Sequence, residues 1–158
     1  MMIIQHTNFK LVILGLVYIL KPISFKSEFC TVVAELKPVT ATQSSLWRND
    51  ANKFGAGNCI DGDEGSDKRG GRYVICHTNT ERAPWIAIDY GTSVAVERVD
   101  IFNRGDCCGQ RTRNVEVWIS NTLPTSGSRR FSGGTVLGRF AGPASNGQHI
   151  TISGQKLL

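Results

Sequence analysis

Alternation of apolar and polar residues predicts that this chain is built mainly from β-strands. In residues 115–120, two valines and an isoleucine alternate with Glu, Trp and Ser, which is the pattern of a strand with one buried face. Residues 85–90 have the length and the β-branched content of a second strand. Residues 94–103 predict a third strand, with Val99 and Asp100 on opposite faces.

Shorter strands are predicted at residues 135–140 and 149–153, and the dipeptide Asn146-Gly147 between them is a strong turn signal. Glycines at positions 65, 70 and 71 predict a long loop, and no segment after residue 24 has a convincing apolar period of 3.6 residues. Short strands joined by turn-rich loops indicate an all-β fold, an antiparallel β-sandwich or barrel. We expect residues 36–158 to form this single domain.

The first 24 residues have the composition of a signal peptide. Lys10 precedes an apolar run at residues 11–20, and Lys21 and Pro22 follow it. The run is too short to span a bilayer, which favours a cleaved leader over an uncleaved membrane anchor. Because no clear small-x-small triplet follows the run, we place the cleavage site between Pro22 and Val33. The mature protein is therefore expected to be secreted.

The charge of the chain is mildly basic. Its formal net charge is +5 at pH 7, and removal of the leader would take away Lys10 and Lys21 but no acidic residue. The remaining basic residues do not form clusters interleaved with aromatic residues, the pattern that typifies nucleic-acid binding. The composition therefore argues against a nucleic-acid partner.

The most informative stretch is residues 103–111, NRGDCCGQR. Arg104 and Arg111 lie seven positions apart, and His77 lies 27 positions before the first of them. A guanidinium offers a rigid fork of donors and no acceptor, so two that converge must recognise oxygen atoms. Asp106 can hold the forks in place and offset part of their mutual repulsion.

Five cysteines in a secreted chain are expected to be oxidised, and an odd number leaves at least one over. Cys107 and Cys108 are adjacent, with Cα atoms held at ~3.8 Å, below the usual range for a disulfide. Each could instead bond to Cys30, Cys59 or Cys76, none of which has an obvious partner. The flanking arginines and aspartate favour a bond between the neighbours, which would form a flat, apolar plate. Donors beside such a plate suit a deoxy-sugar, which has hydroxyls on one side and a methyl group on the other.

Taken singly, each of these residues has an ordinary structural explanation. His77 could be a surface histidine, the two arginines could be solvated loop charges, and Trp47 could be a core aromatic. Arg104-Gly105-Asp106 also spells an integrin-type tripeptide, but we expect the aspartate to point inward toward the arginines. The spacing of the whole set is what favours a site.

The complete pattern resembles the fucose-binding motif of the F-type lectins, the fucolectin and tachylectin-4 family. That motif comprises His77 and Arg104-x-Asp106-x-x-x-x-Arg111, with the adjacent cysteines inside it. Further matches are ATQSS at residues 41–45, CIDG at 59–62, and CHTN at 76–79 followed by Pro84-Trp85. The resemblance runs from about residue 37 to the C-terminus. It implies a discoidin-like jelly roll in which ATQSS forms the opening loop.

By this resemblance, His77, Arg104 and Arg111 would hydrogen-bond the ring oxygen and the axial 4-hydroxyl of α-L-fucose. The Cys107–Cys108 disulfide would pack against the sugar ring, and Trp47 would supply an apolar wall for its methyl group. The protein would then be a secreted lectin for fucosylated glycans on cell or microbial surfaces, with a role in adhesion or innate recognition. Since one shallow site binds weakly, we expect a homo-oligomer or another multivalent array.

The family also contains a structural Ca²⁺, which implies that Asn58, Asp61 and Asp63 are metal ligands. They are hard oxygen donors at a loop spacing that suits calcium. The alternative is an ordinary turn at residues 61–63 whose carboxylates cap backbone amides.

Two departures from the family pattern affect these expectations. Cys76 is adjacent to His77, where family members usually have one residue between the two. The chain also ends where family members continue through a final pair of strands. We therefore expect a domain that is incomplete at its C-terminus, in which the partner of Cys76 and a Cys-Glu pair of calcium ligands are missing. Such a domain would have a weakened calcium site.

Other functions have less support. A Cys-His nucleophile pair is conceivable, as is a zinc site formed by Cys59, Cys76, His77 and Cys107. The cysteines would be oxidised, however, and their spacing fits no known zinc site. We therefore expect that the protein is not an enzyme. The alternative to the lectin is a discoidin-like or Arg-Gly-Asp adhesion module that binds protein or a membrane surface.

Overall fold

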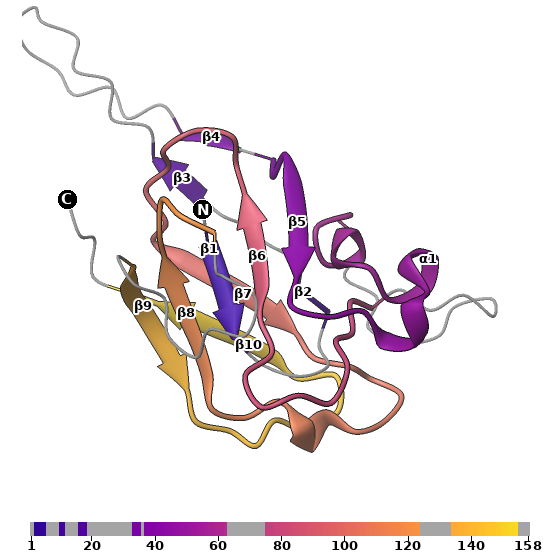
Figure 1. Cartoon of the computed structure of the whole chain (residues 1–158). Coiled ribbons are helices and arrows are strands. Elements are labelled where there is room, and N and C mark those ends of the chain that lie inside the picture. The colour runs from indigo at the N-terminus through magenta and orange to yellow at the C-terminus, as the bar shows by residue number, and fades with distance from the viewer. Residues whose placement is uncertain are drawn as a thin grey trace, which may run out of the picture.

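The computed structural model describes residues 37–62, 75–123 and 134–154 in full. Four short strands before residue 37 are described by their backbone alone: β1 (Met2–Gln5), β2 (Lys10–Leu11), β3 (Leu16–Tyr18) and β4 (Val33–Glu35). The described residues form antiparallel sheets with one short α-helix, which confirms the predicted all-β fold (Figure 1).

The largest sheet has five strands in the order β5-β6-β1-β8-β9. Its remaining members are β5 (Thr40–Gln43), β6 (Ile86–Asp89), β8 (Val115–Ile119) and β9 (Thr135–Phe140). The second sheet has the order β10-β7-β2, with β7 (Arg98–Phe102) and β10 (His149–Ser153). Strands β3 and β4 form a separate pair, and every pairing is antiparallel.

The main hydrophobic core lies between the two larger sheets. Alternate residues of β6, β8, β7 and β10 contribute to it, namely Ile86, Ile88, Val115, Val117, Val99, Ile101, Ile150 and Ile152. Burial of each such side chain contributes roughly 1.5–3 kcal/mol. Asp100 lies on the opposite face of β7 from Val99 but is also buried. It is covered because its carboxylate accepts hydrogen bonds from the side chains of Arg98, His149 and Thr151.

The predicted strands agree with the observed ones within one or two residues, with two exceptions. The strand expected at residues 94–103 begins only at Arg98. Residues 41–45 were expected to form a loop, and this is wrong, because Thr40–Gln43 is strand β5 and pairs with β6. This pairing satisfies backbone groups that a loop would leave to water. The predicted glycine-rich loop at residues 65–71 lies outside the described residues.

Short helical turns follow β5 and were not predicted. They are η1 (Trp47–Asn49), α1 (Ala51–Phe54) and η2 (Ala56–Cys59), and a fourth, η3 (Gly109–Arg111), lies between β7 and β8. Asp50 caps α1, because its side chain accepts a 3.2 Å hydrogen bond from the N–H of Lys53. Helices of three or four residues are too short to give a readable period of 3.6.

Strand β1 lies in the middle of the five-stranded sheet, between β6 and β8 (Figure 1). Its backbone pairs with both neighbours, so that Ile3 lies opposite Ala87 on one side and Trp118 on the other. This strand falls within the predicted signal peptide, whose cleavage stays a prediction. Among the described residues, no helix combines the length and the apolar character needed to cross a bilayer.

Candidate functional site

His77 is the buried centre of the candidate site. Its backbone is fixed on both sides: the N–H donates to the carbonyl of Phe54 at 3.0 Å, and the carbonyl accepts from the N–H of Trp47 at 3.0 Å. The Nε2 amide of Gln43 donates to the same carbonyl at 3.1 Å. The imidazole packs between two aromatic rings, with centroid distances of 4.9 Å to Trp47 and 5.7 Å to Phe54. These contacts hold the ring in one position.

The tautomer of His77 follows from its neighbour. Nδ1 lies 2.6 Å from the carbonyl oxygen of Thr78, which can only accept, so Nδ1 bears the proton. Burial is the largest effect and lowers the pKa of His77; the bond to Thr78 raises it by less, and the charges of Arg104 and Arg111 lower it further. The ring is therefore neutral over more of the pH range than a free histidine. Its Nε2 atom is a hydrogen-bond acceptor in that state.

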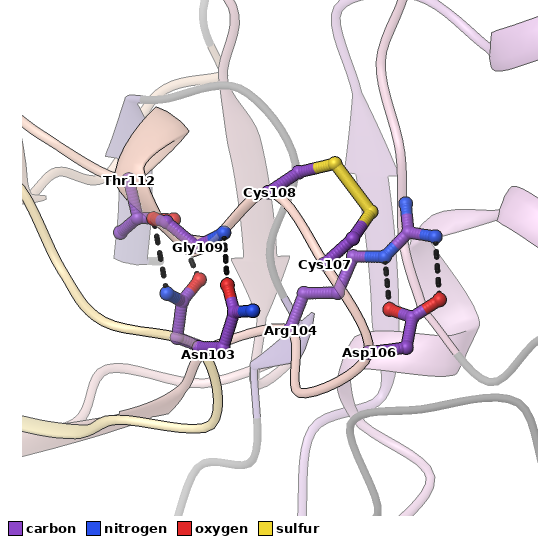
Figure 2. Close-up of polar contacts among 8 residues, drawn as sticks. Asn103, Arg104, Asp106, Cys107, Cys108, Gly109 and Thr112 are labelled. Atoms are coloured by element: carbon purple, nitrogen blue, oxygen red, sulfur yellow. Dashed lines mark hydrogen bonds and ion pairs between the residues drawn. A yellow bond between two sulfur atoms is a disulfide. The ribbon is translucent and has the colours of Figure 1, made fainter.

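Arg104 forms a two-pronged ion pair with Asp106. The Nε and Nη2 atoms of Arg104 donate to the two carboxylate oxygens, the second at 2.8 Å (Figure 2). The hydrogen bond from Arg104 holds the pKa of the Asp106 carboxyl below its usual value. The aspartate thus faces the arginine, as the sequence predicted. The Arg-Gly-Asp tripeptide is folded on itself, which argues against its use as an adhesion motif.

Cys107 and Cys108 are bonded to each other, with Cα atoms 3.7 Å apart. The bridge lies on the same loop as Arg104 (Figure 2). Cys108 has a left-handed backbone with φ of 66°, a conformation that a non-glycine residue adopts only when its surroundings enforce it. Both cysteines are partly exposed, so the bridge forms part of the surface of the loop.

The loop is held by Asn103, whose side chain is fully buried. The Nδ2 atom of Asn103 donates to the carbonyls of Gly109 at 3.1 Å and Ser145 at 2.7 Å. Its Oδ1 atom accepts from the hydroxyl of Thr112 at 2.7 Å (Figure 2). One amide therefore ties together both ends of the loop and a neighbouring chain segment. Sequence reasoning gave Asn103 no role, because a buried amide is recognisable only from its distant partners.

Gly109 allows this loop to pack closely against residues 145–146. Its N–H donates to Oδ1 of Asn146 at 2.7 Å, and a Cβ atom added at Gly109 would lie 2.6 Å from the backbone of Ser145 and Asn146. Only glycine fits such an approach. Arg111 follows in the same 3-10 turn and has an exposed side chain. Its charge contributes to the lowered pKa of His77.

A second loop beside His77 is anchored by Glu81, which sequence reasoning also missed. The hydroxyls of Ser44 and Ser45 both donate to Oε1 of Glu81, the first at 2.7 Å. The Oγ atom of Ser45 in turn accepts from the N–H of Asn79 at 2.9 Å. These bonds tie the segment after His77 to the end of β5. The structure thus brings Trp47 into contact with His77, and the charges of Arg104 and Arg111 both act on the pKa of its imidazole. The binding roles of these residues stay a prediction.

The predicted calcium ligands, Asn58, Asp61 and Asp63, are not brought together, within the described residues, by contacts like those around His77. Asn58 donates its amide to the carbonyls of Lys53 at 3.0 Å and Ile75 at 3.2 Å, and Asp61 is exposed. Asp63 lies outside the described residues. In the ranges that the structure describes, no three His, Cys, Asp or Glu side chains cluster. The calcium site therefore stays a prediction.

Cys76 is bonded to Cys59, with Cα atoms 5.5 Å apart, a normal separation for a disulfide. The expectation that its partner lies in a missing C-terminal segment is therefore wrong. The expectation failed because Cys59 and Cys76 are 17 residues apart and nothing local to the sequence indicates that the chain brings them together. With two disulfides formed, these four cysteines supply no thiolate for a zinc site or a nucleophile. Cys30 lies outside the described residues.

Comparison with known proteins identifies the family. The sequence profile of the NedA-like, galactose-binding domain, of F5/F8 type C, matches residues 58–154. The chain therefore belongs to the family of NedA-like, galactose-binding domains. No solved structure matches the chain significantly.

Individual relatives agree with the resemblance to F-type lectins. The chain is 39% identical over 89 residues to Fucolectin-4 of Anguilla japonica, which covers 55% of this chain and 48% of the relative. It is 35% identical over 88 residues to Fucolectin of Anguilla anguilla, covering 55% and 54%. A Pentraxin fusion protein of Xenopus laevis is 36% identical over 62 residues, covering 39% and 15%. The chain spans about half the length of the fucolectins it matches. The F-type lectin resemblance is thereby confirmed.

The family and the eel relatives also bear on whether the protein is an enzyme. The matching domain is described as galactose-binding, and the eel relatives are named fucolectins. The chain is therefore a non-enzymatic binding protein, as the sequence predicted.

Proposed function

We propose that this chain is a lectin domain and that its ligand is terminal α-L-fucose, bound at His77, Arg104 and Arg111 beside the Cys107–Cys108 bridge. The observation that supports this most is the fixed tautomer of His77. A neutral imidazole with an accepting Nε2 lies near two guanidinium groups that can only donate. The names of the eel relatives and of the family agree with a carbohydrate ligand.

The mixture of donors and acceptors suits a sugar hydroxyl. A hydroxyl can donate its proton to Nε2 of His77 and accept from a guanidinium at the same time. A carboxylate or phosphate could accept from the arginines but has no proton for Nε2. Because the site offers both hydrogen-bond donors and a hydrogen-bond acceptor, it favours a neutral hydroxylated ligand over a simple anion.

The apolar parts of the site suit a deoxy-sugar. Trp47 packs on His77 and is partly exposed, and the Cys107–Cys108 bridge is partly exposed as well. A methyl group buried against such surfaces would contribute about 0.8 kcal/mol. This is the term that favours L-fucose over L-galactose, which has a hydroxymethyl group at the same position. Because the total for one sugar is small, useful affinity requires several copies of the site, in a homo-oligomer or on a multivalent surface.

Retention on fucose-agarose tests the proposal. The wild-type chain should be retained and should elute with free L-fucose, whereas free D-galactose at the same concentration should elute it poorly. Arg104→Lys should lower the affinity at least tenfold, because an ammonium is a point charge and cannot replace the two-pronged donor.

The matched control is Arg139→Lys. Arg139 is exposed on β9 and donates to Oε1 of Glu116 at 2.7 Å, away from the loop that carries Arg104. This variant should be retained like the wild type. Equal retention of the two lysine variants would show that the site is wrongly assigned. Wild-type protein that elutes with galactose and not with fucose would overturn the sugar specificity alone.

We also propose a calcium ion held by Asn58, Asp61 and Asp63. The amide nitrogen of Asn58 donates to the carbonyls of Lys53 and Ile75, which fixes the side chain and leaves its Oδ1 atom to bind an ion together with the two carboxylates. An ion would tie α1 to the segment that enters His77. Binding only to the native state would stabilise it by about 2.7 kcal/mol at a hundredfold excess over Kd.

Thermal melts in millimolar calcium and in chelator test this site. The expected upward shift should disappear in Asp61→Ala and persist in Glu97→Ala, where an exposed acid is removed just before β7. A shift that persists in Asp61→Ala would place the ion elsewhere.

Secretion is the proposed location. Two disulfides in one small domain favour an oxidising compartment. Detection of the chain in culture medium with both bridges intact would support it, and retention of the chain in the cytosol with reduced cysteines would contradict it.

A further inference from the structure

Arg48 lies at the edge of the candidate site, beside Trp47. Its guanidinium carbon lies 5.7 Å from the ring centroid of Trp47, whose ring lies 4.9 Å from that of His77. The distance from Arg48 to Trp47 and the distance from Trp47 to His77 are each comparable to the size of one sugar ring. A ligand that places its terminal sugar on His77 and extends past Trp47 would therefore bring its next sugar to Arg48.

The acidic side chains described around the site already have partners. Asp50 accepts from the N–H of Lys53 and pairs with its ammonium at 3.3 Å. Glu81 accepts from Ser44 and Ser45, and Asp106 is paired with Arg104. Arg48 itself is exposed and rests on the face of Trp47. Within the described residues, its positive charge is therefore not neutralised by a carboxylate.

The backbone holds Arg48 in an unusual conformation. Arg48 and Asn49 have φ values of 54° and 53°, in the left-handed region that residues with a side chain rarely adopt. The turn is closed by the N–H of Asn49, which donates to the carbonyl of Leu46 at 3.3 Å. Backbone of this kind persists where the surrounding structure enforces it and is common at ligand-binding sites. A guanidinium that stacks on an aromatic ring in such a turn loses less freedom when it binds an anion.

We propose that Arg48 forms an anion-binding subsite, which binds a sulfate or carboxylate on the sugar next to the terminal one. This inference rests on the proposed sugar binding at His77, and it predicts a preference among glycans that share the same terminal fucose. The planar fork of a guanidinium matches the paired oxygens of both anionic groups. The net charge, which is +5 for the whole chain and stays positive without Lys10 and Lys21, would assist the approach of such ligands at low ionic strength.

The test compares three immobilised glycans: a neutral trisaccharide whose terminal fucose is linked to galactose, the same trisaccharide with a 3-O-sulfate on that galactose, and the same trisaccharide with galacturonic acid in place of that galactose. We expect about fivefold tighter binding to at least one charged glycan than to the neutral one, lost in 1 M salt. A gain with the sulfated glycan alone would identify a sulfate subsite, and a gain with the galacturonic acid glycan alone would identify a carboxylate subsite.

Arg48→Asn is the informative variant, because asparagine tolerates the left-handed backbone and removes the charge. It should bind the neutral glycan like the wild type and lose the preference for charged glycans. Arg139→Gln, which removes an exposed charge from β9, should keep that preference. Equal binding of all three glycans by the wild type would overturn the subsite, as would a preference that survives in Arg48→Asn. Failure to bind even the neutral glycan would instead overturn the proposed sugar binding at His77.

Discussion

The Nδ1 atom of His77 donates to the carbonyl oxygen of Thr78 at 2.6 Å, and this contact decides what the opposite side of the imidazole can do. In the neutral ring, Nε2 has a lone pair and accepts. In the protonated ring, both nitrogen atoms donate. Because burial and two arginine charges lower the pKa of His77, the accepting form extends to more acidic pH than in a free histidine.

This predicts how sugar binding depends on pH. A hydroxyl that donates to Nε2 needs the neutral ring, so affinity should be unchanged as pH falls through 6.5, the ordinary value, and should decrease only near the lowered pKa of His77. Asp106 titrates below its own usual value of 3.8 and should stay ionised across this range. Isothermal titration with free fucose between pH 7.5 and 4.5 would measure the profile.

The control for the pH profile is His77→Asn, which removes the titrating group. Its binding should be weaker and should not vary with pH in this range. If wild-type affinity instead rises as pH falls, the imidazolium donates to the ligand, and the assignment of Nε2 as an acceptor is wrong.

The stability of the fold should follow the same titration with a definite sign. In the unfolded chain His77 has its ordinary pKa, and in the folded chain its pKa is lower. The unfolded state therefore binds more protons between these two values. The contribution of His77 is fully present above pH 6.5 and is lost as pH falls through its folded pKa. Urea unfolding should show that the difference in free energy of unfolding between the wild type and His77→Asn becomes smaller as pH falls through this window.

Gly109 should be intolerant of a side chain. A Cβ atom there would lie 2.6 Å from backbone atoms of Ser145 and Asn146, which cannot move independently of the chain. We expect Gly109→Ala to lower the free energy of unfolding by roughly 1–3 kcal/mol and to weaken sugar binding. Gly57→Ala is the matched control, because a Cβ atom at Gly57 meets nothing within 4 Å. Similar melting temperatures for the two variants would contradict the close approach seen at Gly109.

Asn103 should control the loop without touching the ligand. Asn103→Ala would leave the carbonyls of Gly109 and Ser145 and the buried hydroxyl of Thr112 without this partner. Each unsatisfied group costs about 1–3 kcal/mol, and the cost is smaller where a water molecule can replace the lost hydrogen bond. We therefore expect severe destabilisation. Asn103→Asp keeps the acceptor for Thr112 and loses both donors, so it should also be clearly destabilised. A variant Asn103→Ala with the wild-type melting temperature would show that the loop is held by other contacts.

The sequence allowed prediction of the residues that could contact a ligand, because their chemistry is unusual at short range. Paired arginines around adjacent cysteines are informative before any fold is known, and the distance to His77 adds to this. The strands after residue 84 were also predictable, because their buried faces repeat every second residue. These features depend on local pattern and on residue type alone.

The residues that position the site were not predictable, because their partners are distant in sequence. Glu81 is anchored by Ser44 and Ser45, which lie 37 and 36 positions away. Asn103 reaches Ser145 across 42 positions. A polar residue whose partners are so distant looks like any surface residue until the chain is folded. The pairing of Cys59 with Cys76 was missed for the same reason.

Strand β1 provides the last prediction. Met2–Gln5 pairs with β6 along one edge and with β8 along the other, so it closes the gap between two strands that carry the core residues Ile86, Ile88, Val115 and Val117. Without it, both neighbours would present unpaired backbone groups to solvent. We expect a chain that lacks residues 1–24 to unfold at lower temperature than the full chain or to aggregate.

A single substitution separates backbone pairing from other effects of that deletion. Ile3→Pro removes the N–H of the residue that lies between Ala87 and Trp118, and proline is not tolerated in the middle of a sheet. Ile3→Val keeps the N–H and a β-branched side chain, so it should leave the melting temperature nearly unchanged. Because the predicted leader includes this strand, mass spectrometry of the secreted protein completes the test. A stable mature chain that begins after residue 24 would show that β1 is dispensable, and a retained N-terminus would show that the strand belongs to the native sheet.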